Sequence, residues 1–275
     1  MTDIKLIALD LDGTLLNSNK ELTPRNRAAL EEAARRGIWI VPATGRFYRG
    51  MPEAIRGLPF VRYAITINGA EALDARTGES LYSAVIPTEE AIAFYEHLDA
   101  LPVIYDSYID NWGYMTASMQ ERAADYTGDP HLLKMIRELR APVPELKAYI
   151  AERRLRPQKM QLFTNDVAFR DALLPELTRR YPQFAVSTSL KNNIEVNSRG
   201  ADKGNALLAL AERLGVRREQ TAAFGDGLND LSMIRAAGTG IVMANGHPEV
   251  KAAADRLTGD CDSDGVAQAL ERLLD

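Results

Sequence analysis

Residues 4–14 read Ile-Lys-Leu-Ile-Ala-Leu-Asp-Leu-Asp-Gly-Thr, an apolar run that ends in two carboxylates and a Gly-Thr turn. A run that is apolar on both faces is typical of a central strand in a parallel sheet. Ionised carboxylates are costly in such surroundings unless a cation pairs with them. Open α/β sheets bind their ligands beyond the carboxyl ends of the strands. The stretch therefore predicts that Asp10 and Asp12 lie where a metal ion meets a reacting group, although Asp and Gly are also ordinary turn residues.

Composition limits the classes of protein and partner. The chain has 275 residues, of which 46% are hydrophobic and 26% charged, as in a globular protein of one large domain or two smaller ones. A net charge of -5 argues against a nucleic-acid or anionic-membrane partner. The single cysteine, Cys261, excludes an internal disulfide, and with only three histidines it argues against a zinc site. No run of 18 apolar residues occurs. We therefore expect a cytoplasmic protein whose partner is a small molecule.

The first part of the chain has a β-α-β-α-β rhythm. After the first strand, Thr23 and Pro24 are typical of a helix start, and Gly37 of a helix end. The segments 38–43 and 63–67 then read as strands that run into polar or glycine-containing turns. This alternation is the pattern of a parallel sheet.

The same rhythm returns near the C-terminus, after a long interruption. There we expect a helix at 202–214, a strand at 221–224, a helix at 229–236, a strand at 241–243 and a terminal helix. Between about residues 81 and 195, short strand-like segments lie between helical patterns instead. We interpret residues 83–192 as an inserted α+β domain, with residues 1–82 and 193–275 forming the core. Elaboration of a single sheet is the alternative. The strand-like segments are 101–105, 112–116, 159–163, 184–188 and 193–196, and the clearest helical patterns are 89–98 and 167–180.

Four residues at predicted strand ends or helix starts have distinct chemical roles available. The carboxylate of Asp10 can attack an electrophile and form a covalent intermediate. Asp12, two residues later, can reach the same centre as a general acid and then as a general base. The hydroxyl and N–H of Thr44 suit a phosphate oxygen, and Lys203 adds a cation to a helix start, where anions bind. Thr44 and Lys203 are weak signals when each is taken alone.

The segment 225–230, Gly-Asp-Gly-Leu-Asn-Asp, is the strongest signal after the first. It follows an apolar strand, and its two carboxylates have the alternative of serving only as turn and helix-start residues. If its strand neighbours that of Asp10, then Asp10, Asp12, Asp226 and Asp230 converge. Two like charges 4 Å apart repel by about 4 kcal/mol at an effective dielectric near 20. Such a cluster needs a cation, and oxygen ligands beside a phosphate favour Mg²⁺.

Together these residues resemble the haloacid dehalogenase superfamily of phosphohydrolases, and within it the Cof-type, sugar-phosphatase-like group. The resemblance covers nearly the whole chain in order, although the insertion matches by position and length rather than by motif. Asp10-Leu11-Asp12-Gly13-Thr14 resembles the nucleophile motif, Thr44-Gly45-Arg46 the second motif, Lys203-Gly204 the third and Gly225–Asp230 the fourth, while Asn68-Gly69-Ala70 and Glu195-Val196 match segments typical of the Cof-type group.

The resemblance implies a fold, an activity and a set of site residues. It implies a Rossmann-like, doubly wound parallel sheet with the Asp10 strand in the centre, flanked by the strands that end at Thr44 and Asn68 on one side and at Asp226 and Met243 on the other. The insertion would be a cap that seals the site and reads the organic part of the substrate. Asp10 would become phosphorylated, and Asp12 would protonate the leaving alcohol and then activate water. Mg²⁺ would be held by Asp10, the backbone carbonyl of Asp12 and Asp226, while Asp230 would complete the metal site or orient Lys203. The predicted substrate-binding residues are Thr44, Gly45, Arg46, Asn68, Lys203 and Asn229.

Three alternatives are weighed against a metabolite phosphatase. A halide-displacing dehalogenase is disfavoured, because its chemistry does not need the acid catalysis that Asp12 offers. A phosphomutase would use the same aspartyl-phosphate, but the size and position of the insertion resemble those of hydrolases. A non-catalytic phosphate-binding regulator could keep the fold, yet no motif residue is missing. Candidate residues for reading the organic part, which can equally be core residues of the insertion, are Tyr105, Trp112, Tyr114, Lys191 and Asn192.

Overall fold

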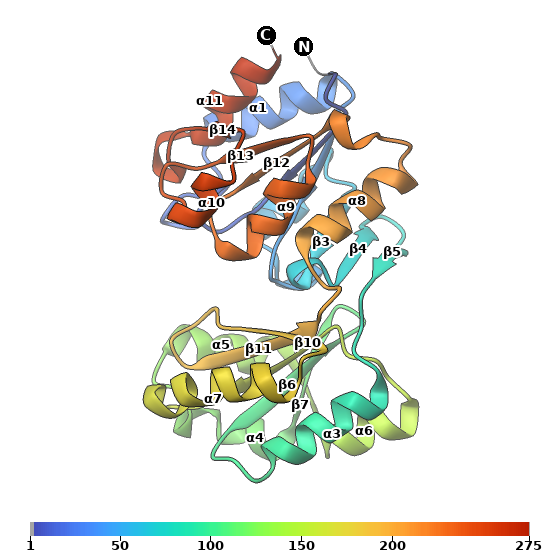
Figure 1. The fold of residues 1–275 in the computed structure, drawn as a ribbon, viewed down its shortest axis with the longest axis vertical. Helices are drawn as coiled ribbons and strands as arrows, with labels where there is room; N and C mark the ends of the chain where they lie inside the picture. Colours follow the sequence, from blue (N-terminus) through green and yellow to red (C-terminus); the bar gives the residue numbers. More distant parts are fainter. Residues whose placement is uncertain (1–2, 275) are drawn as a thin grey trace. The chain divides into compact units, whose positions relative to one another are not determined.

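The computed structural model describes residues 3–274 (Figure 1). The chain divides into two compact units. The core unit comprises Met1–Ser83 and Gly200–Asp275, and the inserted unit comprises Ala84–Arg199. Among the described residues, no helix is long and apolar enough to cross a membrane.

A five-stranded parallel sheet lies at the centre of the core unit, in the order β14-β13-β12-β1-β2. The chain order reverses between β1 and β12, which are paired in parallel with Leu9 opposite Phe224. This is the topological switch point that the resemblance implied, and such a point is where open α/β sheets bind ligands. The strands are β1 (Leu6–Leu9), β2 (Trp39–Pro42), β12 (Thr221–Gly225), β13 (Thr239–Val242) and β14 (Arg256–Leu257).

Helices cover both faces of this sheet because alternate residues of β1 are apolar on both sides. Ile7 and Leu9 belong to one apolar cluster, packed with residues of α1 and α11, whereas Leu6 and Ala8 belong to a second cluster with α8 and α9. The doubly wound α/β fold is therefore confirmed. The helices of the core unit are α1 (Pro24–Arg35), α2 (Glu53–Arg56), α8 (Lys203–Arg213), α9 (Leu231–Ala236), α10 (Pro248–Ala252) and α11 (Gly265–Leu274).

The strand predicted at residues 63–67 is present, but it is joined to the parallel sheet only by one bridge and not by a full ladder. The strand β3 (Tyr63–Thr66) instead pairs antiparallel with β4 (Glu71–Asp74), which pairs with β5 (Ser80–Ser83) in a separate three-stranded sheet. The chain reverses because Ile67, Asn68 and Gly69 all have positive φ, and Asn-Gly favours such a tight reversal. A single parallel bridge, Ala43 to Ile65, still places the end of β3 beside the end of β2.

The inserted unit is built on a six-stranded mixed sheet in the order β10-β11-β9-β6-β7-β8. One apolar cluster packs this sheet against α3, α6 and α7, and a smaller cluster packs residues of its other face against α5. The elements are α3 (Thr88–Leu98), β6 (Ile104–Ile109), β7 (Trp112–Thr116), α4 (Ala117–Glu121), α5 (Pro130–Leu139), β8 (Arg140–Val143), α6 (Leu146–Arg153), β9 (Lys159–Phe163), α7 (Val167–Arg180), β10 (Phe184–Ser187) and β11 (Asn193–Ser198).

The second boundary of the insertion differs from the expected one. The inserted unit ends at Arg199 rather than at residue 192. The reason is that β11 pairs with both β9 and β10, so it completes the sheet of the insertion instead of opening the returning core.

Candidate active site

Two of the predicted carboxylates meet because their strands are neighbours. Asp10 directly follows β1, and Asp226 directly follows β12. The backbone N–H of Asp10 donates to the carbonyl of Phe224 at 3.0 Å, which continues the parallel ladder to the last residue before the loops. Oxygens of Asp10, Asp226 and Asp230 all lie within 4.8 Å of one another. The convergence expected from the sequence is therefore present for these three residues.

Lys203 is the cation inside this cluster. Its Nζ donates to Oδ1 of Asp10 and to Oδ1 of Asp230, each at 2.6 Å, and its side chain is fully buried. Burial alone would lower the pKa of Lys203, but the charges of Asp10 and Asp230 outweigh it and raise this pKa. Lys203 is therefore a permanent ammonium group that lies against the predicted nucleophile.

Asp230 orients its neighbours with both carboxylate oxygens. While Oδ1 accepts from Lys203, Oδ2 accepts from the backbone N–H groups of Asp226 and Gly227, each at 2.9 Å. The 3₁₀ turn Leu228–Asp230 brings this carboxylate back over the loop that follows β12. These contacts favour a positioning role for Asp230 over direct ligation of a metal ion.

The cluster holds an excess of negative charge. Three carboxylates face one ammonium, and burial followed by the charge of Asp230 raises the pKa of Asp10 to about 8. Burial also raises the pKa of Asp226, whose Oδ1 accepts from the Thr14 hydroxyl at 2.7 Å. A hard divalent cation would remove this excess, and carboxylate oxygens are the donors that Mg²⁺ prefers. The donor set therefore fits Mg²⁺.

Asp12 lies in a different electrostatic environment. Its carboxylate accepts a bidentate pair of hydrogen bonds from Arg46, both at 3.0 Å, and an ion pair from Lys20, also at 3.0 Å. Partial burial would raise the pKa of Asp12, but Arg46 and then Lys20 outweigh it, so this pKa is lowered. The Arg46 side chain, which we expected to bind substrate, thus forms an ion pair with Asp12 in this structure. Lys20 was not predicted, because a lysine in a polar loop carries no signal of its own.

Gly13 allows the loops that follow β1 and β12 to approach each other. Its φ is +90°, and a Cβ atom built there would lie 2.6 Å from Oδ2 of Asp226. Only glycine meets both requirements without strain. The Gly-Thr pair after Asp12 therefore serves the contact with Asp226 as well as the turn.

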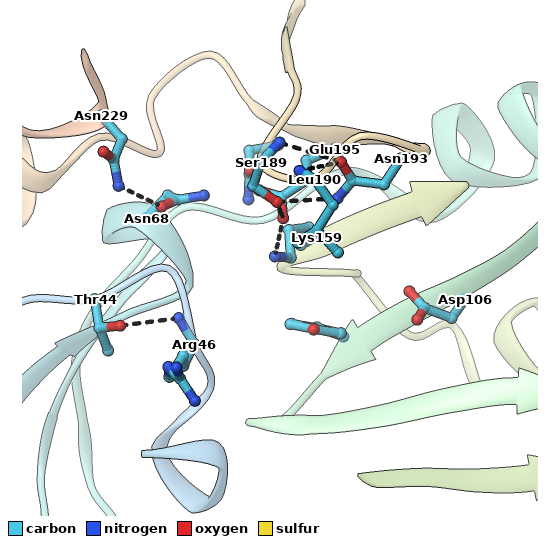
Figure 2. Close-up of polar contacts among 12 residues, drawn as sticks. Thr44, Arg46, Asn68, Asp106, Lys159, Ser189, Leu190, Asn193, Glu195 and Asn229 are labelled. Carbon is cyan, nitrogen blue, oxygen red and sulfur yellow. Dashed lines mark hydrogen bonds and ion pairs between the residues drawn. The ribbon is translucent and has the colours of Figure 1, made fainter. Parts of the chain in front are cut away.

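The predicted substrate-binding residues Thr44, Arg46, Asn68 and Asn229 make polar contacts within the core unit (Figure 2). Thr44 is buried, and its Oγ1 accepts from the backbone N–H of Arg46 at 3.2 Å. Asn68 accepts from the side chain of Asn229 at 3.3 Å, which links the reversal after β3 to the loop after β12. A Cβ atom on Gly45 would lie 2.7 Å from Oδ1 of Asn68, so the second motif packs closely against this side chain.

Three candidates in the inserted unit make contacts within that unit. Tyr105 is buried and stacks on Tyr95 with ring centroids 4.7 Å apart, and Tyr114 stacks on Tyr149 at 5.2 Å. Asn192 donates to the carbonyl of Tyr126 at 3.2 Å. These contacts favour a structural role for the three residues over recognition of the organic part of the substrate.

The sequence interpretation missed buried charged residues on the other face of the inserted sheet. Arg140 donates to Asp106 at 2.6 Å, and Lys159 donates to Glu195 at 3.1 Å. Ser189 also donates to Glu195 at 2.7 Å (Figure 2). The sequence does contain a signal for them. Lys159 and Glu195 each lie in a strand in which polar residues alternate with apolar ones, so their side chains share the face opposite to the apolar side chains.

Comparison with known proteins agrees with this geometry. Residues 7–270 match the haloacid dehalogenase-like hydrolase family. The chain is 31% identical over 268 residues to the 5-amino-6-(5-phospho-D-ribitylamino)uracil phosphatase YcsE of Bacillus subtilis, covering 98% of this chain and 95% of that protein. It is 29% identical to the pyridoxal phosphate phosphatase YbhA of Escherichia coli, covering 96% of each chain.

A solved structure extends the likeness to three dimensions. The haloacid dehalogenase-like hydrolase from Bacteroides thetaiotaomicron matches with a TM-score of 0.81 and 31% identity, covering 98% of this chain and 99% of that one. The match spans both units. The chain therefore belongs to the haloacid dehalogenase superfamily, in its Cof-type group, and is a phosphoric monoester hydrolase.

Proposed function

We propose that the protein hydrolyses small phosphorylated metabolites through an aspartyl-phosphate on Asp10, with Mg²⁺ as cofactor. The observation that carries this proposal is the meeting of Asp10, Asp226 and Asp230 around the buried Lys203 at the switch point of the sheet. The Asp10 carboxylate, beside a fixed ammonium group and two further carboxylates that would hold a cation, suits nucleophilic attack on a phosphate group.

In the first step, a carboxylate oxygen of Asp10 attacks phosphorus as the bond from phosphorus to the alcohol oxygen breaks. Lys203 favours the ionised form of the attacking carboxylate and orients it through its 2.6 Å contact. Mg²⁺, when bound by Asp10, Asp226 and the backbone carbonyl of Asp12, would shield the nucleophile from the phosphate charge and neutralise charge that develops on the phosphoryl oxygens. Thr44 is the candidate for holding one of those oxygens.

Asp12 moves the protons of both steps. It gives its proton to the departing alcohol oxygen in the first step, and then takes a proton from the water that attacks phosphorus and frees Asp10. The ion pairs with Arg46 and Lys20 hold Asp12 ionised, which is the form that the second step uses. Protonation of Asp12 for the first step requires these two pairs to loosen.

The substrate belongs to the small phosphorylated metabolites. The two phosphatases named above act, by their names, on a ribitylamino-uracil phosphate and on pyridoxal phosphate. Both compounds join a phosphate to a polar organic group. We propose that the inserted unit recognises this organic part and that the protein works in the cytoplasm, as expected from its single cysteine.

Phosphate release from p-nitrophenyl phosphate, with and without MgCl₂, tests the proposal. Asp10→Asn should abolish turnover, while Asp99→Asn, the same change in an ion pair of the inserted unit, should leave it unchanged. Beryllium fluoride should inhibit the parent protein but should not bind the Asp10→Asn protein. Turnover that persists in Asp10→Asn would refute the nucleophile. A phosphomutase would instead convert a sugar phosphate to its isomer faster than it releases phosphate.

A further inference from the structure

Asn245 connects the nucleophile loop to distant parts of the core unit. It lies in the turn after β13, and its side chain is exposed. Its Nδ2 donates to the carbonyl of Gly13 at 2.8 Å, and its Oδ1 accepts from the backbone N–H of Cys261 at 3.0 Å. Both ends of one amide are therefore used between segments that are 232 and 16 residues away in the chain.

The same turn also holds the loop of Asp226. The backbone N–H of His247 donates to the carbonyl of Asp226 at 2.8 Å. Gly246 packs closely there, since a Cβ atom on it would lie 3.3 Å from the Cα atom of Asp226. Residues 245–247 thus contact the two loops that carry Asp10 and Asp226, one through a side chain and the other through the backbone.

The orientation of the Gly13 carbonyl depends on its hydrogen bond from Asn245. Gly13 has a left-handed backbone that glycine does not fix by itself, because glycine populates many conformations. Thr14, the next residue, donates its hydroxyl to Asp226 at 2.7 Å. Fixing the Gly13 carbonyl fixes the peptide plane between Gly13 and Thr14, and with it the distance between the two metal-binding loops.

We propose that Asn245 is a positioning residue that preforms the divalent-cation site by locking the Gly13 carbonyl. This inference rests on the proposed function, because the site it preforms is that of Asp10, Asp226 and the Asp12 carbonyl. Residues that orient metal ligands from outside typically change metal affinity by about 10–100-fold when they are substituted.

Titration calorimetry with MgCl₂, on the 275-residue protein without substrate, tests the inference. Asn245→Ala should weaken Mg²⁺ binding by about 10–100-fold. Asn245→Ser, whose side chain is too short to reach both partners, should behave alike. The matched control is Asn165→Ala, which removes an exposed amide that donates to the carbonyl of Asp125 in the inserted unit. This control should leave Mg²⁺ affinity unchanged.

Two further measurements separate positioning from a general loss of structure. The metal-free melting temperature of Asn245→Ala should fall by only a few degrees, as expected for an exposed hydrogen bond. Excess Mg²⁺ should restore kcat with p-nitrophenyl phosphate, and KM should stay unchanged. Parent-like Mg²⁺ affinity in Asn245→Ala would overturn the inference and leave the proposed function standing. Absence of Mg²⁺ binding by the parent protein would overturn both.

Discussion

Replacing Lys203 by methionine tests whether this ammonium holds the acidic cluster together. The substitution keeps most of the side-chain volume and leaves Asp10 and Asp230 facing each other in a buried site. Removing one partner of a buried ion pair costs about 3–5 kcal/mol. Repulsion between two unit charges near 4 Å, about 4 kcal/mol at an effective dielectric near 20, has the same size. For a domain of 150–250 residues, a loss of that size lowers the melting temperature by about 6–20 °C.

Thermal unfolding of the metal-free protein at pH 9, above the raised pKa of Asp10, measures this effect, and two comparisons assign it. Lys5→Met removes an exposed pair with Asp3 and should change stability by at most about 1 kcal/mol. Adding Asp10→Asn to Lys203→Met should restore part of the stability, because it removes one of the two facing charges. A Lys203→Met protein that melts within about 1 kcal/mol of the parent, or a double variant no more stable than the single one, would refute the electrostatic reasoning.

Three other expectations follow from the structure. Because burial raises the pKa of Asp10 to about 8, the metal-free native state binds a proton between pH 3.8 and 8 that the unfolded state lacks, so it loses stability as pH rises through this window. Mg²⁺ competes with that proton. At a hundredfold excess over its dissociation constant, Mg²⁺ should therefore add about 2.7 kcal/mol to the free energy of unfolding near pH 8 and clearly less at pH 6. Asp226→Asn should lose this added stability. Melting curves at both pH values, with MgCl₂ or chelator, check this, and an equal gain at both would contradict it. Arg140→Met leaves the Asp106 carboxylate buried without its partner and should cost about 3–5 kcal/mol, measured by urea unfolding. Gly13→Ala should lower Mg²⁺ affinity in calorimetry, because the new methyl group meets the Asp226 carboxylate; unchanged affinity would show that the loop can shift.

The sequence predicts the parts of this molecule whose signals are local. The strand before Asp10 is apolar on both faces, and it is the central strand of the sheet. The helix expected at 202–214 is present as Lys203–Arg213, with Asp202 as its N-cap. Asp10 and Asp226 could be placed together because parallel neighbours end at the same edge.

The remaining features depend on contacts between distant segments. The strand at Tyr63 has the apolar pattern of a buried parallel strand, but only the left-handed reversal at Ile67 and Asn68 decides its antiparallel pairing. The pairing of Lys20 with Asp12 requires the loop after β1 to fold back. The Asn68-Gly69 pair is a local signal for that reversal, whereas no periodicity or spacing indicates that Lys20 reaches Asp12.

The charges of the two units show why one of them is expected to need an ion. In the inserted unit, Arg140 with Asp106 and Lys159 with Glu195 form two buried pairs of opposite charge. In the core unit, Lys203 faces three clustered carboxylates, and the pKa of Asp10 is raised. Buried opposite charges in equal number neutralise one another, whereas an excess of buried anions costs free energy until a cation binds. The imbalance that makes the core site costly in the absence of metal is therefore the property that would favour a divalent ion there, and such an ion would in turn offset the charge of a phosphate group.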